Sequence, residues 1–255
     1  MSLAISIRSE IIKTKRSAAF WLSIIGAAVI PTIFFLGYVI EPQGSYNRGW
    51  GIHLMQGWQV FNAFLLPMFV ILVCSLIPQI EYKNNAWKQV FASPQSIGNI
   101  FFSKYLTIII MIAFLFIVFN IFLILSAVVP NLFYGKYTFL DTDIDWSKLA
   151  LLNFKTFISL LALISLQYWM SLRFRNFIVP IGIGLGLLIV GVILYQLHWK
   201  HIYKISYAFP VITMEDMNDK NFSFRLQNHE WNSILYCVFF AGMAFLDMRY
   251  RKERG

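Results

Sequence analysis

Charged residues are scarce in this 255-residue chain, where Asp, Glu, Lys and Arg together make up only 13%. Four stretches of at least 21 residues contain no charge at all: 18–40, 60–80, 105–129 and 177–197. A helix of about 20 residues crosses a hydrocarbon core of roughly 30 Å. A soluble domain of this size would not carry four such stretches, so the sequence predicts an integral membrane protein.

Cysteine is rare as well, and strand-like alternation is absent. Cys74 and Cys237 both fall inside predicted spans, so no disulfide framework follows and both are interpreted as small core residues. The apolar stretches do not alternate as the strands of an outer-membrane barrel do. Because a span must satisfy its own backbone polar groups in lipid, the predicted class is all-α.

Catalytic motifs are also lacking. The sequence contains no nucleophile elbow and no Walker A loop, so we expect no catalytic residues and no ATPase site of its own. The four histidines fall in predicted external loops, without the spacing of a zinc protease: His53, His198, His201 and His229. We therefore expect no metal site and no bound cofactor.

The predicted spans hold almost no ionisable residues. Glu81, Lys155 and Asp247 fall at predicted span ends, where snorkelling toward the membrane surface would explain them. A proton-coupled carrier usually needs ionisable groups buried between its spans. Their absence argues against a self-powered carrier and for a protein that takes its energy from elsewhere.

Two shorter segments, 156–172 and 232–246, raise the number of predicted spans to six. Both termini then lie on one side, with 13 of the 21 Lys and Arg residues on that side and 7 on the other. The positive-inside rule places the richer side in the cytoplasm. Five spans would instead export the basic tail, which includes Arg249, Arg251, Lys252 and Arg254. We expect one membrane domain, residues 1–255, in a bacterial inner membrane.

The net charge of +9 does not indicate nucleic acid, because the basic residues flank the spans and face anionic lipid headgroups. At the N-terminus, Leu3, Ile7 and Ile11 recur every four residues among basic side chains. The pattern fits a short amphipathic helix in the membrane interface, and it fits equally a basic flank that only fixes topology. Arg8 is one of the basic residues of this segment, and the candidate residues of the helix are Glu10, Lys13, Lys15 and Arg16.

The first predicted cytoplasmic loop runs from Pro78 to Pro94 and predicts a short helix with one apolar face. That face consists of Tyr82, Ala86, Trp87, Val90 and Phe91. Lys104 marks the return of the chain into the membrane. Two surfaces are suitable for the aromatic rings, the lipid headgroup layer and a groove on a partner protein, and the pattern alone leaves both open.

Glycines recur in the stretch 177–197, but not as a nucleotide-binding loop. No strand precedes them and no ribose-binding acid follows about 20 residues later. Gly182 and Gly186 instead form a small-xxx-small pair, which favours close packing of one helix on another.

Three segments resemble subunits of a known transporter family. They are SEIIKTKRS at 9–17, followed by Phe20 and Trp21; IEYKNNAWK at 80–88, closing on Ser93 and Pro94; and QYWMSLRF at 167–174. These segments resemble ABC-2-type permease subunits, and the match is closest to the small six-span permeases of lantibiotic and bacteriocin self-protection transporters. The motifs are informative about the family and uninformative about the substrate.

The resemblance implies a twelve-span pair of permease subunits, identical or different, which binds two separate ATP-binding subunits on its cytoplasmic side. The N-terminal helix would be the interfacial elbow. Residues 81–94 would be the coupling segment, seated in a groove of the ATP-binding subunit. Its residues of interest are Glu81, Tyr82, Lys83, Asn84, Trp87, Lys88, Phe91 and Pro94.

The leading hypothesis is therefore the permease subunit of an ABC transporter that moves or expels a substrate, such as an antimicrobial peptide or a lipid-like molecule. A membrane scaffold or sensor without transport is the alternative, while an intramembrane enzyme lacks a visible catalytic cluster. External acids at 141–145 and 215–219, and aromatic residues at 46–58, suit a cationic amphipathic peptide. They equally suit solvated loops beside an interfacial aromatic belt.

Overall fold

The computed structural model describes residues 2–40, 49–84, 86–134, 138–140, 142–216 and 223–250. All regular structure within these ranges is helical, as predicted. Some residues used in the sequence analysis lie outside the described residues: Tyr46, Asn85, Asp141, Asp219, Arg251, Lys252 and Arg254.

Six stretches of helix in the described chain are long and apolar enough to cross a membrane, as the sequence predicted. They are α2 (Ala18–Ile40), the run Gly49–Lys83, α6 (Ile97–Tyr134), α7 (Trp146–Arg173), α8 (Ile178–Gln196) and α10 (Asn228–Tyr250). The run Gly49–Lys83 consists of α3 (Gly49–Val60), the π-helical turn η1 (Phe61–Leu65) and α4 (Leu66–Lys83).

The two shortest predicted spans are longer in the structure. The segment 156–172 belongs to α7, which has 28 residues, and 232–246 belongs to α10, which has 23. The charges that bounded the predictions do not end these helices. Lys155 is buried inside α7, and Asp247 lies within the last turn of α10 beside Arg173. Both helices therefore contain the roughly 20 residues that are needed to cross a hydrocarbon core.

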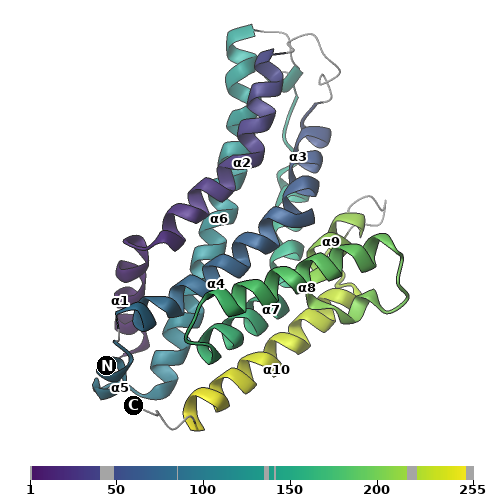
Figure 1. The fold of residues 1–255 in the computed structure, drawn as a ribbon. Helices are drawn as coiled ribbons and strands as arrows, with labels where there is room; N and C mark the ends of the chain where they lie inside the picture. The colour runs from purple at the N-terminus through teal and green to yellow at the C-terminus, as the bar shows by residue number, and fades with distance from the viewer. Residues whose placement is uncertain are drawn as a thin grey trace.

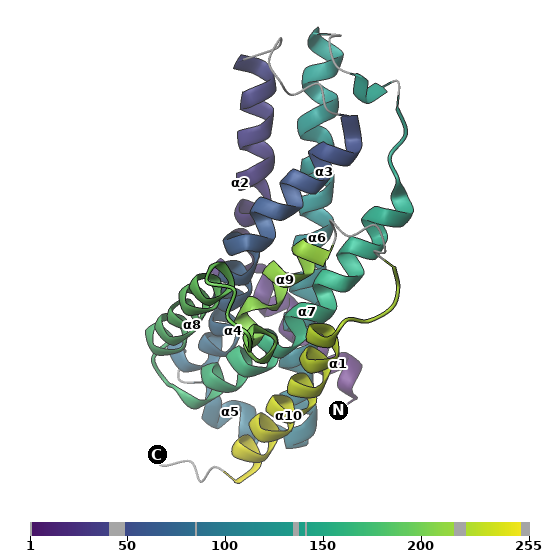
Figure 2. The ribbon, with the colours of Figure 1, turned by 90° about the vertical axis from the view of Figure 1, so that its right-hand side faces the viewer.

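The helices form two regions, which Figures 1 and 2 show from two sides. In one, α2 packs along α6, with α3 beside their upper parts. In the other, α7 packs against α4 and α10, and α8 packs on α4. With 38 residues at 1.5 Å each, α6 is about 57 Å long, well beyond the roughly 30 Å of a hydrocarbon core. The α2–α6 region accordingly extends above the other in both views.

Part of the predicted loop 198–231 folds back into the bundle. Two 3-10 turns, η3 (Ile202–Lys204) and η4 (Ser206–Ala208), lead into α9 (Phe209–Asp216), which packs on α7. Tyr207 is buried and donates a hydrogen bond to Gln167 Oε1 at 2.8 Å, while Gln167 Nε2 donates to the carbonyl of Pro180 at 2.8 Å. Nearly all residues of Ser206–Met214 are buried, so this part of the predicted external segment is not a solvated loop.

The start of α1 (Leu3–Lys15) and the end of α10 lie at the same end of the molecule in both views, close to α5 (Trp87–Ala92). We refer to this end as the α5 end. An even number of spans requires that the two ends of the chain meet on one side, and the structure satisfies that requirement. The assignment of the α5 end to the cytoplasm stays a prediction from the positive-inside rule.

Candidate coupling site

The predicted coupling segment, residues 81–94, consists of the last residues of α4, a short turn and the six-residue helix α5. The sequence analysis expected a helix between Pro78 and Pro94. In the structure, Pro78 lies inside α4, which continues to Lys83, and α5 starts only at Trp87. The helix α5 ends where Ser93 adopts an extended conformation before Pro94, as a residue preceding proline does.

The aromatic face of α5 turns inward. The rings of Trp87 and Phe91 stack with centroids 5.5 Å apart, and Tyr82 lies 5.3 Å from Trp87. Trp87, Val90 and Phe91 pack against the hydrophobic core of the same chain. The Tyr82 hydroxyl donates to the carbonyl of Leu172 at 2.7 Å. These contacts cover part of each ring and leave Trp87, Val90 and Phe91 half-buried, so the chain itself is one partner that the sequence pattern did not suggest.

The outward surface of this segment is polar and basic. Its exposed residues are Lys83, Asn84, Lys88, Gln89, Ala92 and Pro94. Only Lys83 and Lys88 among them carry a charge, and both are positive. A protein that docks on α5 from outside therefore meets mainly this surface, since Trp87 and Phe91 are half-buried behind it.

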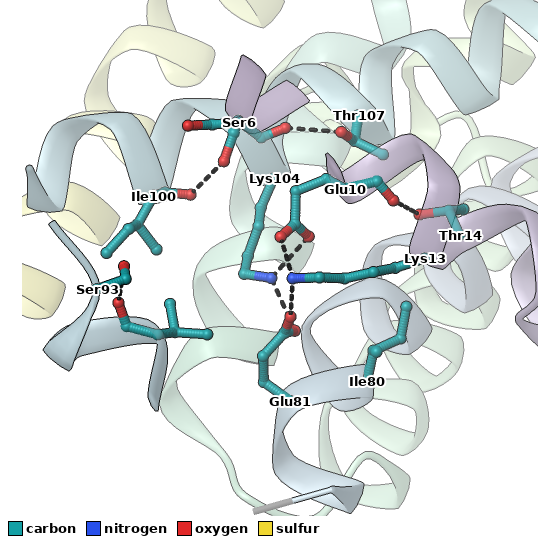
Figure 3. A network of polar contacts seen from close by, with 12 residues as sticks. Ser6, Glu10, Lys13, Thr14, Ile80, Glu81, Ser93, Ile100, Lys104 and Thr107 are labelled. Carbon is teal, nitrogen blue, oxygen red and sulfur yellow. Dashed lines mark hydrogen bonds and ion pairs between the residues drawn. The ribbon is translucent and has the colours of Figure 1, made fainter. Parts of the chain in front are cut away.

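Four charged side chains meet directly beside α5, and Figure 3 shows them from close by. Lys104 Nζ of α6 lies 2.8 Å from Glu10 Oε2 and 2.7 Å from Glu81 Oε2. Lys13 Nζ lies 2.7 Å from Glu10 Oε1 and 3.0 Å from Glu81 Oε1. Each lysine thus bridges both glutamates in a closed ring of alternating charge, which we call the charge ring.

The charge ring is buried except at one member. The side chains of Lys104, Glu81 and Glu10 are 0%, 2% and 9% exposed, whereas that of Lys13 is 37% exposed. Burial alone would raise the pKa of Glu10, but the charges and hydrogen bonds of Lys104 and Lys13 outweigh it and lower that pKa below 4.5. Burial alone would lower the pKa of Lys13, and its contacts with Glu10 and Glu81 raise it above 10.5. Both groups are charged at neutral pH.

This ring corrects the expectation that span-end charges snorkel. Glu81 points into the protein, and Lys104 is fully buried. Its members come from α1, α4 and α6, with Lys104 94 residues from Glu10, so local spacing did not reveal it. One signal was present in the sequence. Acids are few on the predicted cytoplasmic side, and Glu10 and Glu81 are two of them.

The N-terminal helix packs with a polar face toward α6. Its buried residues are Ser6, Glu10 and Thr14, spaced four apart, whereas Leu3, Ile7 and Ile11 are only half-buried. Lys15 and Arg16 are exposed, as Ile5 and Ile12 are. The predicted helix is confirmed, but the residues that orient it are polar. Its position relative to the membrane surface stays a prediction.

A second buried ion pair lies toward the far end of the molecule. Lys155 Nζ of α7 lies 3.0 Å from Glu230 Oε2 of α10, and it also donates to the carbonyl of Arg225 at 2.9 Å. Glu230 Oε2 accepts from the backbone N–H of Gln227 at 2.7 Å and so caps the first turn of α10. Lys155 does not snorkel either, because its charge is paired inside the protein.

The histidines and tryptophans of the predicted external segments are partly internal. His53 is buried in α3, where Nε2 donates to the carbonyl of Leu123 and Nδ1 accepts from the hydroxyl of Tyr38, both at 2.9 Å. His229 is buried against Thr213. Trp50 and Trp58 are buried as well, so they do not form a surface belt. Within the described residues, no three His, Cys, Asp or Glu side chains are placed to hold a metal.

The glycine contacts of α8 also differ from those expected. A Cβ at Gly182 or Gly186 would meet nothing within 4 Å among the described residues of this chain. Close approach occurs instead at Gly184, where a Cβ would lie 2.6 Å from Gln167 Oε1, and at Gly191, which packs on the backbone of Tyr207 and Ala208. The helix packing predicted at Gly182 and Gly186 therefore finds no partner among the described residues of this chain.

Residues 6–191 match a family model described as ABC-2 family transporter protein. No curated protein and no solved structure matches the chain. The matched region contains α1 from Ser6 onward, the coupling segment and all four members of the charge ring. ABC-2 permeases are transmembrane components that generally work with an ATP-binding subunit. Six apolar helices in the described chain and a family match over most of its length lead to one conclusion: this chain belongs to the ABC-2 family of transporter proteins.

Proposed function

We propose that this permease is driven by a separate ATP-binding subunit that docks on the outward surface of α5. The observation that carries the proposal is the polar, basic surface around Lys83, Lys88 and Gln89, held in place by an aromatic face that packs on the bundle behind it. A helix that a partner displaces passes this displacement to the rest of the protein only if its inner face is packed against the other helices. ATP-driven closure of two such subunits then shifts the permease between access states.

The docking surface is tested by reversing the charge of Lys88. In the full-length permease, co-expressed with Walker A proteins from the same genome, Lys88→Glu should reduce co-purification of the ATP-binding subunit about tenfold, because a charge reversal at a polar contact opposes docking. The matched control is Lys200→Glu, an equally exposed lysine beyond the far end of α8. Equal co-purification of the two variants would exclude docking on this surface.

Aspartate substitutions at Trp87 or Phe91 would be a poorer test. Both rings are packed inside the chain, so a carboxylate there disturbs the fold as well as any docking contact. Lys88 is exposed, and substitutions at such positions usually leave stability within about 0.5 kcal/mol. A lost contact at Lys88 therefore reports on docking alone.

For the substrate, we propose an amphipathic molecule, either an antimicrobial peptide or a lipid-like compound. The support is the exposure of Asp143, Asp145 and Glu215 in the loops that lead into α7 and at the end of α9, away from the α5 end. A cationic amphipathic peptide is complementary to these acids. In proteoliposomes, such a synthetic peptide should stimulate ATP hydrolysis, and the triple variant with Asn or Gln at these positions should respond less. Stimulation by lipid alone, unaffected by the variant, would instead identify a lipid-like substrate.

A further inference from the structure

Three separate contacts tie the coupling segment to α1 and α6. Before α5, Glu81 joins the charge ring with Glu10 and Lys13 of α1. After α5, Gln95 Oε1 accepts a hydrogen bond from the Ser6 hydroxyl of α1 at 3.0 Å. In the middle, Lys104 Nζ lies over the ring of Trp87, 5.6 Å from its centroid. The residues before, within and after α5 are thus each in contact with α1 or α6.

Burying charged side chains between helices costs free energy, and apolar packing of equal volume often stabilises a protein as well or better. What a buried ring of alternating charge adds is a penalty for relative movement. If α4 shifts against α1 and α6, Glu81 loses Lys13 and Lys104, and each buried charge that is left without a partner costs heavily. Apolar side chains would slide past one another with a much smaller penalty. The ring therefore favours a movement in which the ends of these helices shift together. It disfavours a movement in which they slide past one another.

We propose that Glu10, Lys13 and Lys104 are positioning residues that make α1, α5 and the adjoining ends of α4 and α6 move as one unit. The inference rests on the proposed docking of an ATP-binding subunit on α5. It goes beyond that docking, because it assigns the route by which displacement of α5 reaches α1 and, through Lys104, the long helix α6. Lys13 is the member that water reaches, so solvent screening weakens its share of the attraction.

The experiment measures distances within the full-length permease in complex with its ATP-binding subunit. Spin labels are placed at Lys15 of α1, Ala92 of α5 and Arg249 of α10, all exposed, after Cys74 and Cys237 are replaced by Ala. Ala92 is chosen so that Lys83, Lys88 and Gln89 stay intact for docking. Pairs are compared without nucleotide and with ATP trapped. We expect an unchanged Lys15–Ala92 distance and a changed Ala92–Arg249 distance. A Lys15–Ala92 distance that changes as much as the other pair would overturn the inference.

The variant Glu10→Gln should uncouple the unit, and Lys13→Met should loosen it. In Glu10→Gln, the Lys15–Ala92 distribution should broaden and become dependent on nucleotide, while the ATP-binding subunit still binds. In Lys13→Met, the same distribution should broaden less. Lys13→Met retains the Lys104 contacts of both glutamates, so it remains informative if Glu10→Gln lowers expression. The matched control is Arg173→Met, which removes an exposed ion pair at the same end that does not involve α1 or α5.

These results separate the inference from the proposed function. A complex that forms normally, in which Glu10→Gln and Arg173→Met both leave the Lys15–Ala92 distribution as it is in the parent chain, would show that the ring is only structural. A Lys88→Glu variant that binds the ATP-binding subunit as the parent does would instead contradict the docking surface on which the proposal rests.

Discussion

The two buried ionic sites of this protein are built differently. The charge ring joins α1, α4 and α6 through four side chains, and one of them, Lys13, is reached by water. The Lys155–Glu230 pair joins only α7 and α10, and both of its side chains are almost completely enclosed. Its carboxylate also caps α10. The enclosed pair fixes one helix start, whereas the ring links α1, α4 and α6 beside the surface proposed for docking.

Breaking the enclosed pair should have the largest effect. Lys155→Met leaves Glu230 buried without its cation, and removing one partner of a buried pair costs about 3–5 kcal/mol of unfolding free energy. The measurement is equilibrium unfolding in mixed micelles. In the double variant Lys155→Met/Glu230→Gln, most of the loss should be recovered, since no uncompensated charge remains. A double variant as unstable as the single one would show that packing, not charge, sets the cost.

Breaking the ring should have a smaller effect that depends on which lysine is removed. Lys104→Met leaves two buried carboxylates with one shared cation, so we expect a loss of about 3 kcal/mol. Lys13→Met removes the exposed member, and solvent screening limits its loss to about 1 kcal/mol. Equilibrium unfolding of both lysine variants in the same mixed micelles measures the two losses. Equal losses for the two lysines would contradict the order of burial.

The spans were predictable because each is encoded locally, in a continuous apolar run that lipid requires. The charge ring was not, because it depends on where α1 lies against α6. The apolar spacing of Leu3, Ile7 and Ile11 drew attention to one face of α1, while Ser6, Glu10 and Thr14 are the residues that pack. A polar face at helical spacing looks like a solvated one until its partners are known.

The packing of the aromatic residues of the coupling segment was likewise only partly predictable from the sequence. The spacing of Trp87 and Phe91 correctly predicted one shared face and a short helix. It did not reveal what covers that face, because the covering residues belong to the core of the same chain and are distant in sequence. The identity of an apolar partner is a tertiary property, whereas the existence of an apolar face is local.

The ring should also respond to pH, and by less than the substitutions. The pKa of Glu10 is lowered below 4.5 by Lys104 and Lys13, so its contribution is present above that value and is lost as pH falls through the folded-state pKa. The pKa of Lys13 is raised above 10.5, so its contribution is present below that value and is lost only at higher pH. The difference in stability between the parent chain and Glu10→Gln should therefore be constant near neutral pH and shrink in acid. A difference that changes between about pH 6 and 8 would contradict this assignment.

The smallest effect should come from the exposed ion pair at the α5 end. Arg173 Nη1 lies 2.7 Å from Asp247 Oδ1, as short as any contact in the ring, but the Arg173 side chain is 59% exposed. Pairs of this kind contribute about 0–1 kcal/mol, because water solvates both charges when they separate. Arg173→Met should accordingly shift the unfolding midpoint less than Lys13→Met does, in the same micelles. If it shifted the midpoint as much as Lys104→Met, distance and not burial would set the strength of these pairs, and the contrast between the ring and the enclosed pair would lose its physical basis.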